Sequence, residues 1–213
     1  MKLIVTTLLA TAAFSGGAIA GSFEAPVAAV APLTVIEPAG TDWGGLYVGG
    51  MYTFETGNWE GFDENSSFGN WEAEGEKYGA FAGYNIQRGA LVYGGELAYS
   101  VGDTTFTALQ PGSDGNTSDT FLDAKARLGY VLNDILIYGV AGGSWATSET
   151  SGNPPIELDG FNYGAGAQMK FGNGMFAGVE YLIRDLAGDN PINPDISYEY
   201  VNQSLELRAG WQF

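Results

Sequence analysis

From Trp43 onward, apolar and polar residues alternate with a period of two, which is the pattern of β-strands whose two faces meet different surroundings. Eight such runs can be delimited, each close to the length of about 9–11 residues that a tilted strand needs to cross a bilayer. The runs cover residues 43–54, 77–87, 91–101, 121–131, 135–147, 160–171, 175–184 and 203–213. The pattern therefore predicts an all-β protein built from eight antiparallel strands.

The connections between these runs alternate in length. Three tight turns rich in Gly and Asn, which adopt positive φ angles at little steric cost, lie at residues 88–90, 133–134 and 172–174. The four other connections are long and cover residues 55–76, 102–120, 148–159 and 185–202. This asymmetry is typical of outer-membrane barrels. We therefore expect an eight-stranded antiparallel up-and-down transmembrane β-barrel with short periplasmic turns and long extracellular loops.

The two faces of the predicted strands differ in charge. One face is apolar in every strand; in the fifth it is assigned Leu136, Tyr138 and Val140, although Ile137 and Trp145 fit the assigned faces poorly. A charge facing lipid costs about 2–4 kcal/mol at the bilayer midplane, so the apolar face suits lipid. The opposite face carries Glu96, Asp123, Lys125, Arg127, Lys170, Glu180, Arg184, Glu206 and Arg208. We expect these charges to form an ion-pair network that plugs the barrel interior.

Alternation by itself leaves open which face points inward. A soluble, lipocalin-like barrel places the apolar face inside, whereas a membrane barrel places it outside. The segregation of short and long connections favours the membrane arrangement. The end of the chain does too, because it looks like the C-terminal signal recognised by the barrel assembly machinery, with apolar residues at every second position: Leu205, Leu207, Ala209, Trp211 and Phe213.

The N-terminal region has the pattern of a secretory signal peptide. Lys2 provides a minimal positive region, residues 3–14 are mostly apolar, and residues 18–20 read Ala-Ile-Ala, an A-x-A cleavage site. The following stretch is rich in Ala, Val and Pro and predicts an extended linker. We therefore divide the chain into a signal peptide (1–20), a Pro/Ala-rich periplasmic linker (21–41) and an outer-membrane β-barrel (42–213).

Composition excludes several classes of function. The chain contains no Cys and no His, which removes disulfides, thiolate metal sites, cysteine catalysis and the usual general base near neutral pH. No motif points to a cofactor or a metal site, and we expect no enzymatic activity. The 25 acidic and 8 basic residues give a formal net charge of −17, which argues against nucleic acid as a partner.

Much of the acidity falls in the predicted long connections. The first one is expected to be an acidic surface loop containing Glu55, Glu60, Asp63, Glu64, Glu72, Glu74 and Glu76. Such a loop is either a solvated, self-repelling segment or a collector of divalent cations that bridge to lipopolysaccharide phosphates. Expected partners are outer-membrane lipid, lipopolysaccharide and the barrel assembly machinery, and the sequence names no surface ligand.

From residue 42 to the end, the chain resembles the small outer-membrane β-barrel porin family of the OmpA/OmpX type, and within it the RopB-like group of Gram-negative bacteria. The resemblance rests on segments that follow one another in the family's order: DWGGLYVGG, GAFAGYNIQ, GGELAYS, AKARLGYVL, YGVAGGSWA, NYGAGAQMKF, VEYLIRDLAG and LRAGWQF. It implies an eight-stranded barrel in the cell outer membrane, in a family whose members often have no defined substrate.

Two functions remain open from the sequence. The first is a structural and surface-interaction role in the cell envelope, with an interior plugged by ion pairs. The second is a narrow porin-like channel for water, ions or small solutes, in which the same charges line the path. Eight strands leave an interior just wide enough for side chains to fill, which favours the first function.

Overall fold

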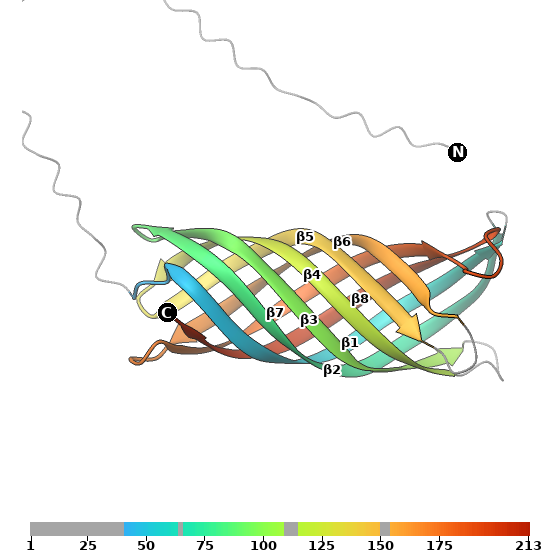
Figure 1. The fold of residues 1–213 in the computed structure, drawn as a ribbon, viewed down its shortest axis with the longest axis horizontal. Helices are drawn as coiled ribbons and strands as arrows, with labels where there is room; N and C mark the ends of the chain where they lie inside the picture. Colours follow the sequence, from blue (N-terminus) through green and yellow to red (C-terminus); the bar gives the residue numbers. More distant parts are fainter. Residues whose placement is uncertain (1–40, 64–65, 109–114, 150–153) are drawn as a thin grey trace, which may run out of the picture. The chain divides into compact units, whose positions relative to one another are not determined.

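The computed structural model describes residues 41–63, 66–108, 115–149 and 154–213. In these ranges the chain forms eight β-strands that close into one antiparallel barrel (Figure 1). The strands are β1 (Gly45–Asp63), β2 (Ser66–Arg88), β3 (Leu91–Ala108), β4 (Gly115–Leu132), β5 (Ile135–Glu149), β6 (Ile156–Lys170), β7 (Met175–Asp189) and β8 (Ile196–Gln212). The predicted fold class is confirmed. The predicted signal peptide and almost all of the predicted linker lie outside the described residues.

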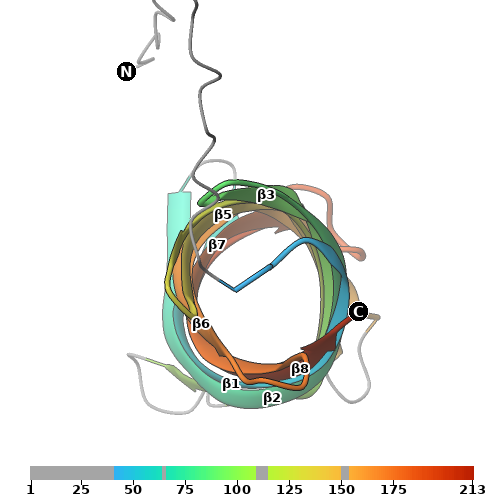
Figure 2. The same cartoon turned by 90° about the vertical axis from the view of Figure 1, so that its left-hand side faces the viewer.

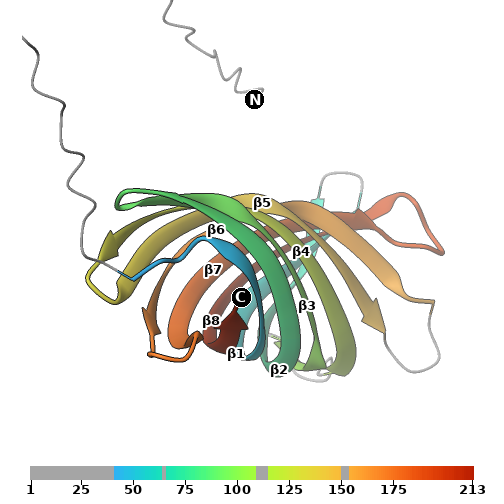
Figure 3. The same cartoon turned by 60° about the vertical axis from the view of Figure 1, so that its left-hand side comes forward.

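Each strand pairs with its neighbours in sequence, and β1 closes the barrel by pairing with β8 from Tyr47↔Gln212 to Asp63↔Ile196. The strands tilt strongly around the barrel axis (Figures 1 and 3). The three tight turns also form where predicted. Gly89, Asn133 and Gly174 have φ angles of 61°, 57° and 85°, the left-handed conformation that Gly and Asn adopt at little cost.

The strands run further than the hydrophobic pattern indicated. Most of the predicted first loop, 55–76, continues β1 to Asp63 and begins β2 at Ser66, and the other long connections shorten in the same way. The physical reason is that outward positions in these extensions are polar, as at Thr56 and Glu74, while inward ones such as Ala73 stay buried. Strand pairing therefore continues where the apolar outer face has ended.

The two faces of the barrel wall have opposite character. Large apolar side chains such as Leu46, Tyr84 and Leu128 project outward and are exposed, whereas the charges of the opposite face are buried inside. An apolar exterior around a charged interior is the arrangement of a membrane barrel. The lipocalin-like alternative, with the apolar face inward, is therefore wrong. Within the described ranges, no helical segment has the length and hydropathy of a membrane-spanning helix.

The face assignment of the fifth strand was wrong. Leu136, Tyr138 and Val140 point into the barrel, with exposed fractions of 1%, 3% and 6%, whereas Ile137 and Trp145 point outward with exposed fractions of 50% and 52%. The interior near the tight turns is itself apolar, so hydrophobicity does not distinguish the two faces of β5 there.

Buried apolar side chains gather toward both ends of the interior. Toward the periplasmic end, the end with the tight turns, Trp43, Tyr47, Leu136 and Phe176 belong to one buried cluster. Figure 2 looks onto this end and shows the segment before β1 crossing the mouth of the barrel. A second buried cluster, toward the extracellular end, contains Trp59, Phe106, Phe121, Leu158, Leu186 and Tyr200. Most of the buried charged side chains lie between the far ends of these two clusters, with Leu182 and Phe121 interspersed among them.

Candidate functional site

The interior charges form what we call the central network. Its four acids and four bases have exposed fractions of only 0–4% and are Glu96, Asp123, Lys125, Arg127, Glu180, Arg184, Glu206 and Arg208. They come from strands β3, β4, β7 and β8, on which inward positions recur at every second residue. Strand register places Glu96 opposite its partner Lys125 across β3 and β4. It also places two acids, Glu180 and Glu206, opposite each other across β7 and β8, and Arg208 lies against both carboxylates. Equal numbers of acids and bases leave the network without net charge.

Half of this network is a closed ring of alternating charges. Lys125 Nζ lies 3.0 Å from Glu96 Oε1 and 2.5 Å from Glu180 Oε1. Arg208 completes the ring, because its Nη2 lies 2.7 Å from Glu96 Oε2 and its Nη1 lies 2.5 Å from Glu180 Oε2. Arg127 joins from outside the ring, with Nη1 3.2 Å from Glu96 Oε2. Each carboxylate thus faces two or more cations, which compensates the loss of hydration of the buried charges.

The other half is organised by Arg184. Its Nε and Nη2 donate to the two carboxylate oxygens of Asp123 at 3.0 and 2.7 Å, a two-pronged contact that matches the planar guanidinium. Its Nη1 donates to Asn202 Oδ1 at 3.0 Å and to Ser204 Oγ at 2.9 Å. Glu206 links the two halves, with Oε1 3.3 Å from Arg184 Nη2 and Oε2 3.5 Å from Arg208 Nη1.

Two tyrosines and the glycines beside them fit the central network into a narrow interior. Tyr47 donates its hydroxyl to Glu96 Oε2 at 3.0 Å, and Tyr138 donates to Glu180 Oε2 at 2.8 Å. The Arg127 guanidinium lies 3.9 Å from the Tyr138 ring centroid, within cation–π range. A Cβ at Gly166 would lie 2.5 Å from the Tyr138 ring, so only glycine leaves room for this tyrosine.

Lys170 was predicted to belong to the same network and does not contact it. It lies half-buried at the periplasmic end, where its Nζ donates to Gln212 Oε1 at 2.8 Å and to the backbone carbonyl of Asp42. The ammonium also lies 5.4 Å from the Trp43 ring centroid. Lys170 therefore holds the segment before β1 against the barrel mouth. Lys170 lies at the end of β6, four residues beyond Gly166, the residue that pairs with Glu180, and this explains the separation.

Sequence reasoning missed a second group, the upper cluster, formed by Glu55, Lys77, Thr104 and Asp119. Lys77 Nζ lies 2.5 Å from Glu55 Oε1, 2.8 Å from Thr104 Oγ1 and 3.5 Å from Asp119 Oδ2. The prediction that Glu55 lies in a surface loop is wrong, because it is an inward residue of β1 with an exposed fraction of 3%. The strand alternation could have shown this, because Glu55 is separated from the inward-facing Tyr47 by an even number of residues and therefore lies on the same, inward face of the strand.

The upper cluster is joined to the central network through one side chain. Asn202 donates from Nδ2 to Glu55 Oε2 at 3.1 Å, while its Oδ1 accepts from Arg184. The Phe121 ring lies between the two groups, 5.1 Å from Lys77 Nζ and 4.9 Å from the Arg184 guanidinium carbon. The polar interior is thus one connected system along much of the barrel.

The remaining predicted acidic residues lie on the outside of extended strands rather than in a free loop. Asp63, Glu72, Glu74 and Glu76 are exposed on β1 and β2, Glu60 is half-buried, and Glu64 lies outside the described residues. Glu76 accepts a hydrogen bond from the Tyr52 hydroxyl at 2.6 Å. Within the described ranges, the acidic side chains do not gather into a group that fits a metal ion.

The predicted assembly-signal residues all project from the outer face of β8. Leu205, Leu207, Ala209 and Trp211 are exposed there, and Phe213 follows the strand with its amide donating to the Leu46 carbonyl at 2.9 Å. Their role in recognition by the assembly machinery stays a prediction.

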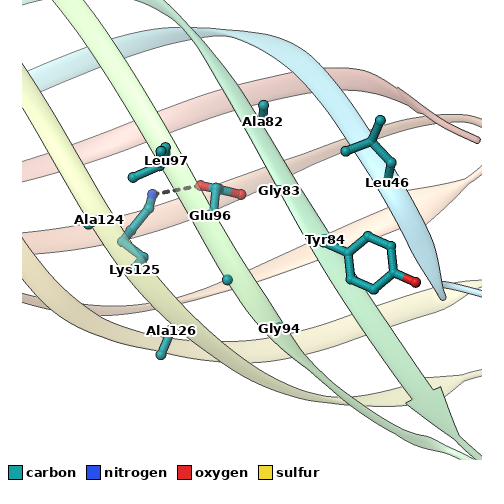
Figure 4. Close-up of a pocket in the computed structure, with 11 residues that line it drawn as sticks. Leu46, Ala82, Gly83, Tyr84, Gly94, Glu96, Leu97, Ala124, Lys125 and Ala126 are labelled. Atoms are coloured by element: carbon teal, nitrogen blue, oxygen red, sulfur yellow. Dashed lines mark ion pairs between the residues drawn. The ribbon is translucent and has the colours of Figure 1, made fainter.

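The lipid-facing wall has a shallow hollow of about 630 Å³ over β2, β3 and β4. Small residues such as Ala82, Ala124 and Ala126 form its floor, with Tyr84 and Leu97 at its edges (Figure 4). The figure also shows the ion pair between Glu96 and Lys125 beside it. The wall therefore separates the buried charges from the bilayer by little more than the backbone and small side chains.

Comparison with known proteins agrees with this architecture. Residues 6–213 match the model of the outer membrane protein beta-barrel domain family. The chain is 30% identical over 185 residues to a 22 kDa outer membrane protein of Rhizobium leguminosarum bv. viciae. This alignment covers 84% of this chain and 81% of the relative. It is 28% identical over 162 residues to a 25 kDa outer-membrane immunogenic protein of Brucella abortus, covering 70% of this chain and 71% of the relative.

Among solved structures, the outer membrane protease OmpT from Escherichia coli superposes with a TM-score of 0.48 at 8% identity, covering 79% of this chain and 97% of that one. The family match spans nearly the whole chain, and the curated relatives are named as outer-membrane proteins. The chain therefore belongs to the outer membrane protein beta-barrel domain family and is a protein of the cell outer membrane.

Proposed function

We propose that this protein is a structural barrel of the cell envelope, whose interior is closed by its ion-pair network and whose extracellular surface carries its interactions. The observation that carries the proposal is the burial of the whole central network, with clusters of buried aromatic and aliphatic side chains toward both ends of the barrel. A path for solutes requires water beside the charges, and an eight-stranded barrel leaves an interior just wide enough for side chains to fill. The absence of His and Cys in the chain and the names of its relatives give no support to an enzymatic role.

Single-channel recording in a planar bilayer tests this proposal. The refolded full-length chain is expected to give a conductance equal to that of bare lipid over a wide voltage range. A wide porin inserted in the same bilayer controls for successful reconstitution, and cold and boiled SDS gels confirm that the added protein is folded. Discrete, reproducible opening events from the folded protein would overturn the proposal.

The alternative function is a narrow channel for water, ions or small solutes, and one observation favours it. Side-chain contacts of 2.5–3.5 Å follow one another without a break from the periplasmic half of the interior to the upper cluster. Their order is Gln168, Arg127, Glu96, Arg208, Glu206, Arg184, Asn202, Glu55, Lys77 and Asp119. Stopped-flow shrinkage of proteoliposomes tests it: a rate above that of protein-free liposomes would favour the channel.

We further propose that lipopolysaccharide is a partner, bridged by divalent cations to the acidic outer wall above the bilayer. Exposed Glu72, Glu74 and Glu76 follow one another on the outer face of β2, and Asp103 lies opposite Glu76 on β3. Carboxylate oxygens are ligands that Ca²⁺ and Mg²⁺ prefer, and phosphate oxygens of the lipopolysaccharide would complete the coordination, because the described acids by themselves form no metal site. Lipopolysaccharide retained by the purified barrel in Mg²⁺ is expected to dissociate in EDTA; retention unchanged by EDTA would contradict the bridge.

A further inference from the structure

The connection between β7 and β8 stands clear of the membrane. It consists of residues 190–195 at the end of the barrel opposite the tight turns. The outward-facing carboxylate of Asp185 marks the upper limit of the apolar exterior of β7. Five further residues of tilted strand lift Asn190 roughly 12 Å above that level, at about 3.3 Å per residue and a tilt near 40°. Lipid tails therefore lie well below this loop.

Every backbone N–H of the loop is hydrogen-bonded. Pro191 and Pro194 have no N–H, and every other amide from residue 190 to 196 donates to a partner within the hairpin. The Asn190 side chain accepts from the amides of Ile192 and Asn193 at 2.8 and 3.1 Å. Its Nδ2 donates to the Tyr198 hydroxyl at 2.9 Å, which ties the loop to the barrel. A loop ordered in this way loses little conformational entropy when it binds a partner.

This ordered loop presents one large apolar side chain to solvent. Ile192 has an exposed fraction of 70%. In the described ranges, the other large apolar side chains of comparable exposure lie on strand faces or at the periplasmic end. A single exposed apolar residue is ordinary on a protein surface. Here it stands at the tip of a fixed loop, which is the geometry of an anchor residue.

The surroundings of Ile192 are acidic. Asp189, Asp195 and Glu199 are exposed beside the loop. The basic residues within the described ranges lie elsewhere: five are buried in the interior, and Arg88 and Lys170 lie at the periplasmic end. The charge that complements this loop is therefore positive.

We infer that the β7–β8 loop is a preformed protein-binding element, whose partner has an apolar pocket for Ile192 edged by Lys or Arg. The inference rests on the proposed surface role and specifies where the contact is made. The experiment that tests it is independent of the conductance test. A conducting barrel would overturn the plugged interior and leave the loop unaffected, whereas failure of the loop experiment would leave the conductance result standing.

Selection from a displayed library of random disulfide-cyclised 12-residue peptides tests this inference. The full-length protein in nanodiscs is the target, and the Ile192→Ser variant is used for counter-selection. The enriched peptides are expected to carry net positive charge and to bind Ile192→Ser at least about tenfold more weakly, because the buried isoleucine surface is lost. The Asp189→Asn/Asp195→Asn variant is expected to weaken binding a few-fold in low salt. Glu72→Gln/Glu74→Gln, which removes the same charge from another part of the wall, is the matched control.

Three outcomes would overturn the inference. They are a library that yields no peptide dependent on Ile192, enriched peptides without net positive charge, and equal losses in the Asp189/Asp195 and Glu72/Glu74 variants. The chain has no cysteine, so a single Ile192→Cys variant can also carry an environment-sensitive fluorophore. Quenching by iodide in water is expected; quenching by brominated lipid instead would show that the side chain enters the bilayer and would equally overturn the inference.

Discussion

The pair formed by Asp123 and Arg184 offers a quantitative test of the central network. Replacing Arg184 by Met removes both prongs of its contact with Asp123 and the donors to Asn202 and Ser204. Ser144 Oγ remains within 2.5 Å of Asp123 Oδ1, so one neutral partner is left for a buried carboxylate. Breaking a buried ion pair from one side costs about 3–5 kcal/mol, and we expect Arg184→Met to lower the free energy of unfolding by that amount.

The reverse change is expected to be milder. Asp123→Asn keeps the shape of the side chain, and Arg184 retains Glu206 at 3.3 Å, so the cost is that of charged hydrogen bonds, about 1.5–3 kcal/mol. In the double variant no unpaired carboxylate remains at position 123. Its cost is expected to fall short of the sum of the two single costs by about 1–3 kcal/mol.

Urea unfolding of the barrel refolded in lipid vesicles, followed by tryptophan fluorescence and by heat-modifiability on gels, measures these free energies. Asp103→Asn on the exposed face of β3 is the matched control and is expected to change stability by no more than about 0.5 kcal/mol. The reasoning is refuted if Arg184→Met behaves like this control, or if the two single costs are additive within about 0.3 kcal/mol.

Three further predictions concern other parts of the wall. Lys77→Met leaves Glu55 buried without its cation and is expected to cost about 3–5 kcal/mol in the same unfolding assay; a cost below about 1 kcal/mol would contradict the upper cluster. Ala141→Arg places a charge on the outer face in the middle of β5 and is expected to cost about 2–4 kcal/mol in vesicles, whereas no loss would mean that this position does not meet lipid. Deleting Phe213 is expected to reduce the folded protein recovered from the outer membrane several-fold while leaving refolding in vesicles unchanged; equal losses in both would point to stability instead of recognition.

The sequence predicts the barrel well because most strands have faces of clearly different polarity. Asp123, Lys125 and Arg127 alternate with Ala124 and Ala126, so both the strand and its inward face follow from the pattern alone. The tight turns are equally clear because Gly89 and Asn133 are residues suited to the φ angles that such turns require.

The errors arise where polarity stops separating the two faces. In β5, Leu136 and Ile137 are both apolar because one meets an aromatic cluster and the other meets lipid. In the extensions of β1 and β2, Glu55 and Glu74 are both acidic because one pairs with Lys77 inside and the other faces water outside. Such positions depend on partners that other strands supply, and a local pattern carries no information about those partners.

The account depends most on which face of each strand meets lipid, and a nitroxide scan along β8 measures this directly. Single cysteines introduced from residue 203 to 209 in the cysteine-free chain would each carry a spin label in vesicles. We expect collision rates with oxygen dissolved in the bilayer to alternate with a period of two, high at Leu205 and Leu207 and low at Ser204 and Glu206. The opposite phase, or high accessibility of position 206 to a water-soluble nickel chelate, would contradict the closed charged interior.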